Sequence, residues 1–301
     1  MSTQKKHGMV APFALHQVIN RNIPTKYEGE FNHYTSPFGL NGIINTEKPS
    51  LWFTHVDYLN DRSEGTYLFD IFREALEDCV ETIAPETHET LSSIKDTDSL
   101  VTMEYFEDGH KKSKNVKAEI FLCCFSTNDD NLSMWNYYVK GKRYEGYNIS
   151  FNKTPVEEKQ LKDCLINVGK IIYDVDKQKQ IIKELILEAD QFQMSSIFLF
   201  WFKVCLNRLK YLFKHPCFSH EQEIRLILKC PIEGKEDMIQ YRLSERGNYI
   251  PYIPVPITNM FNKIVVSPLL CEQKNITSLE RMLKSRGYDC EIKSSECPIR
   301  F

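Results

Sequence analysis

Two glutamates stand at the start of an alternating apolar run near residue 220. In the stretch CFSHEQEIRLILKC (217–230), apolar residues alternate with polar ones as in a half-buried strand, which puts Glu221, Glu223 and Arg225 on one face. Paired carboxylates can stabilise a developing positive charge and orient a nucleophile, as glycosidic-bond chemistry requires. They also suit a solvated strand edge on which Arg225 neutralises its neighbour. The spacing leaves both interpretations open.

Polar side chains mark two earlier apolar runs. In FNHYTS (31–36), strand alternation places His33 and Thr35 on one face, where a neutral imidazole could bind a polar ligand or simply pack with a hydrogen-bond partner. Ser126 and Thr127 end the apolar run AEIFLCCFST, where hydroxyls can turn the chain or bond a ligand.

Aromatic and acidic pairs at helical spacing add two further features. Trp135 and Tyr138 are three residues apart and share a helix face, either as core packing or as a shelf for a flat heterocycle. Asp61 and Glu64 precede the amphipathic run FDIFREALEDCVETI and predict a capping box at its start.

The elements that must position these residues mix without a βαβ rhythm. No glycine-rich turn follows the first strand, which disfavours a dinucleotide-binding Rossmann fold and favours a mixed α+β fold. We expect strands at 31–36, 51–56, 118–127, 145–151, 168–174, 223–230, 238–243, 262–267 and 288–295. We expect helices at 37–46, 69–83, 131–139, 272–287 and through most of 175–214.

Length and composition indicate one large globular domain. The chain has 301 residues, 42% hydrophobic and 26% charged, and a net charge of −3, which gives no overall attraction to nucleic acid or anionic membranes. We expect a polar lead-in at 1–30, then a single domain at 31–301 with a polar insertion around 85–117 and a helical segment around 175–214.

The ten cysteines and the apolar stretches predict a compartment. No CxxC pair or zinc-finger spacing occurs, and Cys123, Cys124, Cys205 and Cys230 lie in apolar runs, so we expect reduced, buried thiols. The start of the chain has no signal-peptide core, and the apolar stretch at 192–202 is too short to span a bilayer. These features predict a cytoplasmic protein with no membrane partner.

Several blocks together resemble a known family. HYTS, LWFTHVDYLNDRSEG, CFST with LSMWNYY and GYNISF, KHPCFSHEQEIRLI and the tail SSECPIRF resemble a bacterial family known only as a domain of unknown function. The resemblance spans roughly 31–301. It implies no activity.

The order of three blocks is also similar to that of the ADP-ribosyltransferase superfamily. Proteins of that superfamily bind NAD in a cleft between a split pair of small sheets. That resemblance implies a split-sheet core with Glu223 stabilising the ribose cation and Glu221 aiming the acceptor or a water. It implies NAD as the substrate and no metal. The implied NAD-binding residues are His33, Tyr34, Thr35, Ser126, Thr127, Trp135, Tyr138 and Arg225.

Three functions therefore compete. The first is an NAD-dependent ADP-ribosyltransferase or NAD glycohydrolase of bacterial stress or phage defence, with a protein or nucleic-acid acceptor and a regulatory partner protein. The alternative is a non-enzymatic recognition module of a defence system, whose strand carboxylates would be salt-bridged. The third is a metal-dependent nuclease that uses Asp129 and Asp130 with the two glutamates. It is the least favoured of the three, because no spacing of these residues singles it out.

Overall fold

The computed structural model describes the chain outside residues 1–3, 25, 45–47, 62, 98–99, 108–109, 140–144, 158–160, 162–163, 193–195, 232–235, 245–246 and 299–301. Its α-helices are α1 (Gln4–Asn22), α2 (Pro37–Ile44), α3 (Tyr67–Glu77), α4 (Pro85–Ser92), α5 (Leu132–Tyr137), α6 (Val175–Gln191), α7 (Ser196–Lys210) and α8 (Gln273–Ser285). Its 3₁₀ helices are η1 (Val56–Tyr58), η2 (Pro216–Glu221), η3 (Glu236–Met238) and η4 (Pro268–Leu270). Its strands are β1 (Phe31–Thr35), β2 (Ser50–His55), β3 (Leu100–Glu107), β4 (His110–Lys117), β5 (Glu119–Ser126), β6 (Tyr147–Phe151), β7 (Leu165–Lys170), β8 (Glu223–Cys230), β9 (Gln240–Leu243), β10 (Tyr249–Pro256), β11 (Lys263–Val266) and β12 (Glu291–Ser294).

A ten-stranded mixed sheet dominates the fold and forks at β5. One edge of β5 pairs with β8, which pairs with β7; the other edge meets β1 at Ser126 and β2 at Phe121 and Leu122. From the fork, one branch runs β1-β6-β11-β12 and the other β2-β10-β9. Strands β11 and β12 are parallel, whereas the pairings at β5 are antiparallel. The predicted α+β class is confirmed.

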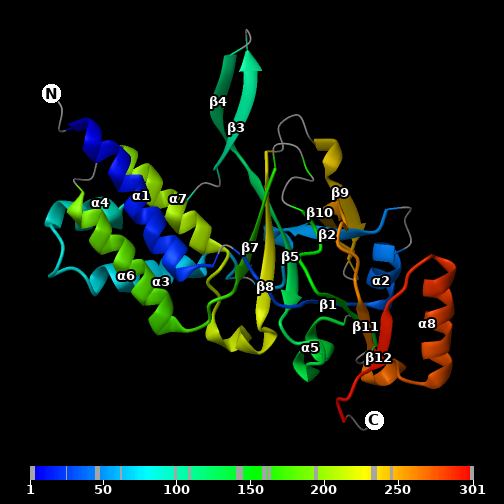
Figure 1. The fold of residues 1–301 in the computed structure, drawn as a ribbon. Coiled ribbons are helices and arrows are strands. Elements are labelled where there is room, and N and C mark those ends of the chain that lie inside the picture. Colours follow the sequence, from blue (N-terminus) through cyan, green and yellow to red (C-terminus); the bar gives the residue numbers. More distant parts are fainter. Residues whose placement is uncertain are drawn as a thin grey trace.

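The two faces of the sheet build two separate cores. Along β5, Ile120 and Leu122 point toward the core shared with helices α1, α3, α6 and α7, whereas Phe121 and Phe125 point toward the core shared with α2 and α8. This division follows from strand alternation, because successive side chains point to opposite faces. We call α1, α3, α6 and α7 the helical group. Figure 1 shows this group at one end of the molecule and α8 at the other.

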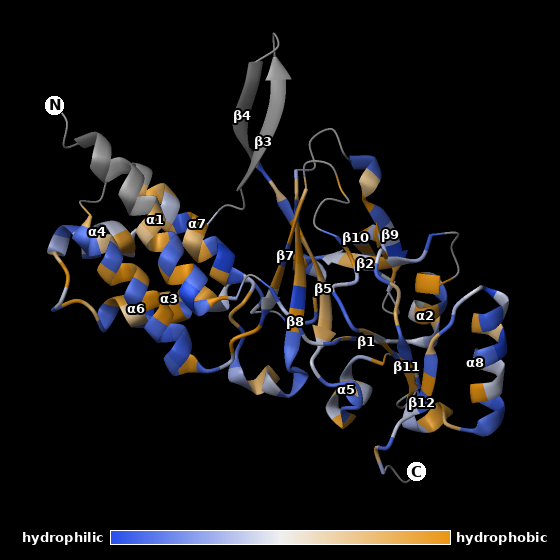
Figure 2. Ribbon diagram, viewed as in Figure 1, coloured by the Kyte–Doolittle hydropathy of each residue, from blue (hydrophilic) through white to orange (hydrophobic). Residues whose placement is uncertain are grey.

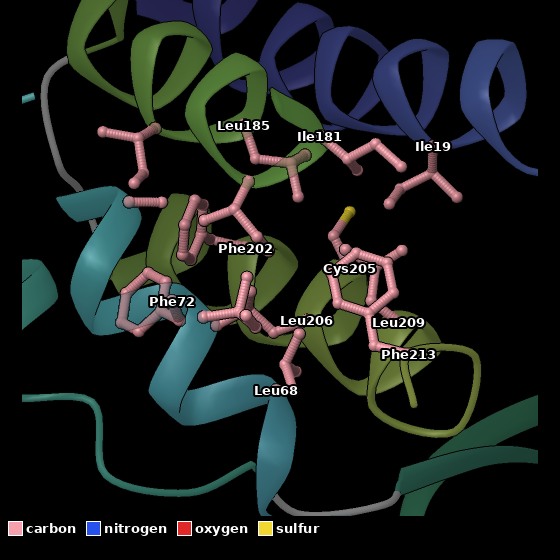
Figure 3. Packing of buried hydrophobic residues seen from close by; sticks show 14 of the residues in the cluster. Ile19, Leu68, Phe72, Ile181, Leu185, Phe202, Cys205, Leu206, Leu209 and Phe213 are labelled. Atoms are coloured by element: carbon pink, nitrogen blue, oxygen red, sulfur yellow. The ribbon is translucent and has the colours of Figure 1, made fainter. Parts of the chain in front are cut away.

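The helical group forms because each helix has one apolar face. Figure 2 shows apolar and polar residues alternating along α3 and α6 at helical spacing. In Figure 3, Leu185 of α6 lies beside Phe202 of α7, and Ile181 of α6 lies near Ile19 of α1. The helical content predicted for 175–214 is confirmed as α6 and α7.

The structure corrects two expectations, one for residues 1–30 and one for the start of α3. The segment expected to be a polar lead-in contains α1, whose Leu15 and Ile19 are fully buried against the helical group. The predicted capping box is wrong, because α3 begins at Tyr67. Asp61 instead accepts hydrogen bonds from the backbone N–H and hydroxyl of Ser63, at 2.8 and 2.6 Å, and closes a turn before the helix.

The polar insertion at 85–117 contains regular structure. It comprises α4 and the antiparallel hairpin of β3 and β4, which projects from the rest of the molecule in Figure 1.

Strand β10 was missed because it contains three prolines. Pro254 and Pro256 lie in the part of β10 that pairs with β2 but not with β9. Pro251 lies in the part that pairs with β9, just before the pairing with β2 begins at Tyr252. A proline nitrogen at each position can therefore face the side on which no ladder hydrogen bond is needed.

The expectation of reduced thiols is wrong for one pair. Cys230 at the end of β8 forms a disulfide with Cys164, 66 residues earlier, just before β7. Cys123, Cys124 and Cys205 are free thiols.

Within the part of the chain that the structure describes, no helix is both long and apolar enough to cross a membrane.

Candidate functional site

Glu221 and Glu223 converge on one lysine. Glu221 ends η2 and Glu223 begins β8, so the two glutamates are not neighbours on a strand as predicted. Between them Gln222 adopts a left-handed conformation, with φ 46° and ψ 49°. The Nζ of Lys214 lies 2.5 Å from Oε2 of Glu221 and 2.9 Å from Oε2 of Glu223. Left-handed backbone is unfavourable for a non-glycine residue, so surrounding contacts must stabilise it.

Arg225 joins Glu223 to a carboxylate from a distant part of the chain. Its Nε donates to Oε1 of Glu223 at 2.7 Å, and its two terminal nitrogens donate to Oε1 and Oε2 of Glu64 at 2.6 and 2.8 Å. A further bond of 3.0 Å goes to the carbonyl of Tyr211. We call Glu64, Lys214, Glu221, Glu223 and Arg225 the charge network. It contains three carboxylates and two cations.

The side chains of the charge network are buried. The side chains of Glu64, Glu223 and Arg225 are 4%, 5% and 1% exposed. Burial alone would raise the pKa of Glu223, but the charges of Arg225 and Lys214 lower it to about 2. Burial raises the pKa of Glu221, and the charge of Glu223 adds to that rise although Lys214 opposes it. The neighbouring carboxylates therefore differ in acidity, with Glu223 the stronger acid.

Three further side chains surround the glutamates. The Tyr138 hydroxyl donates to Oε1 of Glu221, and burial raises the pKa of this tyrosine. The Tyr173 hydroxyl accepts from the backbone N–H of Glu223 at 3.1 Å. Cys124 lies against Glu223 from the neighbouring strand, opposite Arg225 in the register, and desolvation together with the charge of Glu223 raises the pKa of its thiol.

His33 and Thr35 do not join this group. The register aligns Asn32 with Ser126 and Ser126 with Glu223, so these three share one face and His33, the next residue, points to the other. There the His33 ring packs near Phe125, and its Nδ1 lies 2.9 Å from the carbonyl oxygen of Cys124. Burial lowers the pKa of His33, which favours the neutral imidazole. The structure therefore separates His33 and Thr35 from the glutamates.

The other predicted ligand residues have structural partners. Ser126 donates to the Glu221 carbonyl at 2.8 Å, and Thr127 donates to the Gln222 side chain at 3.0 Å. The Tyr34 hydroxyl donates to the carbonyl of Asn128 at 3.0 Å. Trp135 is fully buried. Of the predicted aromatic shelf, only Tyr138 touches a candidate catalytic residue.

Asp129 and Asp130 lie in other contacts. Asp129 pairs with Lys263 at 2.7 Å, and Asp130 accepts from the indole N–H of Trp135 at 2.7 Å and the hydroxyl of Ser295 at 2.6 Å. Among the residues that the structure describes, no group of three or more metal-binding side chains occurs. This arrangement gives no support to the nuclease alternative.

A hollow of about 580 Å³ opens beside the charge network. Glu64 and Tyr211 form part of its wall, together with Asp96 and Lys210, whereas Glu221 and Glu223 are not among its lining residues. Glu64 and Lys210 contribute opposite charges to the wall. The hollow therefore reaches the far carboxylate of the charge network and not the glutamate pair.

Reasoning from sequence missed Glu64 and Lys214 as members of the site. Glu64 was assigned to a helix cap because it stands three residues after Asp61. The residues around Lys214 gave no reason to place it in the site, except that in KHPCFSHEQE it stands seven residues before Glu221. A pair of buried acids requires buried cations, and that requirement could have identified Lys214.

One family model matches part of the chain. Residues 134–226 match the family described as "Protein of unknown function (DUF2971)", a narrower span than the resemblance over 31–301 suggested. No curated protein and no solved structure matches the chain. Lys214, Glu221, Glu223 and Arg225 lie inside the matched span, and Glu64 lies outside it. Residues 134–226 are therefore similar to the DUF2971 family, whose description names no activity.

Proposed function

We propose that the chain is a recognition module, with the charge network serving as the structural joint between its helical group and its sheet. The observation that carries this proposal is the saturation of Glu223. Its Oε1 accepts from Arg225, and its Oε2 accepts from both Lys214 and Arg225.

Saturation matters because the proposed chemistry needs an available negative charge. A carboxylate that stabilises a ribose cation must face the sugar, but the side chain of Glu223 is 5% exposed and lies between two cations. A second positive centre would compete with Lys214 and Arg225 for the same oxygens. Electrostatic catalysis acts on charge that develops inside an accessible, preorganised site.

The positions of the network residues support a structural role. Arg225 belongs to β8, Glu64 to the turn before α3, and Lys214 to the segment after α7. Ion pairs between these three segments hold the helical group against the sheet. A buried ion pair is favourable only when its geometry and hydrogen bonds are nearly complete, as they are around Arg225.

The second candidate is an enzyme of ADP-ribosyltransferase or NAD glycohydrolase type, and the acidity difference between Glu221 and Glu223 favours it. Neighbouring acids with pKa values shifted in opposite directions are common in catalytic sites. In this proposal, NAD would enter after Lys214 moves away. Glu223 would stabilise the ribose cation and Glu221 would aim a water or a protein or nucleic-acid acceptor.

Activity and stability together distinguish the two candidates. Nicotinamide release from labelled NAD and the free energy of unfolding are measured for the unaltered chain, Glu223→Gln and the exposed-site control Glu280→Gln. A recognition module gives background release in all three and a loss of stability only in Glu223→Gln. Release that Glu223→Gln abolishes without loss of stability would overturn the proposal and establish the enzyme.

A further inference from the structure

Strand β9 offers a free edge at one end of the sheet. The sheet order ends at β9, which pairs with β10 from Gln240 to Leu243 and has no second neighbour among the described strands. An edge strand directs part of its backbone N–H and C=O groups away from the sheet, where an extended peptide can pair with them. Figure 1 shows β9 beside β10, on the side of β10 away from β2.

One face of the β9–β10 ribbon carries exposed apolar side chains. Tyr241 and Leu243 lie two apart on β9, and Tyr249 of β10 stands opposite Leu243 in the register, so all three share a face. They are 63%, 65% and 69% exposed. Large side chains grouped in this way on a sheet edge are a feature of protein-binding surfaces.

The opposite face carries an arginine without a carboxylate partner. The Arg242 guanidinium lies over the rings of Trp52 and Tyr252, 5.5 and 5.8 Å from their centres, and donates one hydrogen bond of 2.9 Å to the hydroxyl of Thr54. In the described part of the chain, no carboxylate lies within ion-pair distance of it. A guanidinium has five N–H donors, and the bond to Thr54 is the one that Arg242 donates within the described part of the chain. The contacts with the two rings fix the position of this cation.

We propose that β9 binds an extended peptide segment of a partner protein as an added strand, in which an aspartate or glutamate is flanked by apolar residues. The residue opposite Arg242 points to the Arg242 face, and its two neighbours point to the face of Tyr241, Leu243 and Tyr249. Period-two alternation in the peptide therefore matches both faces at once. This inference rests on the proposed recognition function and identifies its class of partner.

Charge complementarity favours an acidic peptide over a second copy of the chain. Antiparallel pairing of two β9 strands centred on Arg242 would place two arginines directly opposite each other, which is destabilising. Centred between Tyr241 and Arg242, it would place the arginine of one copy on the apolar face of the other. An acidic residue forms a charge-assisted pair with Arg242 instead.

A display selection tests the inference without knowledge of the natural partner. Random nine-residue peptides displayed on phage are selected on the unaltered chain, on Arg242→Glu, on Arg242→Gln and on the exposed-site control Arg281→Glu. Far-ultraviolet circular dichroism and thermal unfolding first establish that each variant is folded. We expect apolar–acidic–apolar triplets to be enriched on the unaltered chain and on Arg281→Glu. On Arg242→Glu, a basic residue should replace the acidic one.

Affinity measurements complete the test. A selected peptide should bind Arg242→Gln about tenfold to a hundredfold more weakly, the usual effect of losing a hydrogen bond to a charged group. Failure to enrich any peptide, or enrichment of the same triplets on Arg242→Glu, would overturn the inference. So would a dimer of the unaltered chain that Tyr241→Ser disperses. Because this test does not involve Glu223, its failure is distinguishable from failure of the recognition function.

Discussion

Replacing Glu64 by glutamine tests the structural joint with the least change in shape. Glu64 accepts two hydrogen bonds from Arg225, at 2.6 and 2.8 Å, and its side chain is 4% exposed. Glutamine keeps one acceptor oxygen but turns an N–H₂ group toward the guanidinium, so one charge-assisted bond is lost and two donors face each other. Hydrogen bonds to charged groups contribute about 1.5–3 kcal/mol, and breaking a buried pair costs about 3–5 kcal/mol. We expect Glu64→Gln to lose about 3 kcal/mol of unfolding free energy.

Urea unfolding followed by circular dichroism measures this loss. The matched control Glu280→Gln removes an exposed carboxylate of α8 and should change the unfolding free energy by less than about 0.5 kcal/mol. For Glu64→Gln we also expect the midpoint of thermal unfolding to fall by about 6 °C, from roughly 2 °C per kcal/mol in a chain of this size. A loss of less than about 1 kcal/mol would refute the idea that the ion pairs hold the helical group to the sheet.

Three further predictions follow from the buried charges and the disulfide. Because the pKa of Glu223 is lowered to about 2, its contribution is fully present above the unfolded pKa near 4.5 and is lost as pH falls toward 2. Glu223→Gln should therefore flatten the acid limb of the curve of unfolding free energy against pH; an unchanged limb would contradict the assigned ion pairs. Burial lowers the pKa of Lys229 to about 8, so the charged lysine destabilises the fold at lower pH. Lys229→Met should add about 1–3 kcal/mol at pH 6 by urea unfolding and less at pH 10, and a loss at pH 6 would contradict this. Cys164→Ser should cost about 2–4 kcal/mol in oxidising buffer, because it opens a loop closed by Cys230. Under dithiothreitol the difference from the unaltered chain should disappear, and an equal loss under both conditions would show that the bond is not the cause.

The sequence predicted the helices and strands in which apolar residues recur at a regular spacing or form a continuous run. Strands β5 and β8 have alternating or continuous apolar runs, and α6 and α7 have apolar positions at helical spacing, so all were expected. Strand β10 could not be predicted, because its prolines are tolerated only through the way that β2 and β9 overlap along it. Helix α1 was missed since its apolar face becomes evident only when α6 and α7 are present to cover it.

The candidate site was predictable only in part, for a physical reason. The acidic pair could be found from spacing, but its chemistry depends on Lys214 and on Glu64, which lies more than 150 residues before the pair. The opposite orientation of His33 depends on register, which aligns Asn32 rather than His33 with Ser126. A shift of one residue would have turned His33 toward Glu223, and nothing local in FNHYTS determines that choice.

Direct observation of NAD at the charge network tests the central claim most sharply. Saturation-transfer NMR with NAD in excess measures contact between the ligand's protons and the protein, for the unaltered chain and for Glu223→Gln. With the glutamate pair closed by Lys214 and Arg225, we predict no saturable transfer to the nicotinamide protons in either protein. Saturable transfer in the unaltered chain that Glu223→Gln removes would contradict the structural role of the charge network.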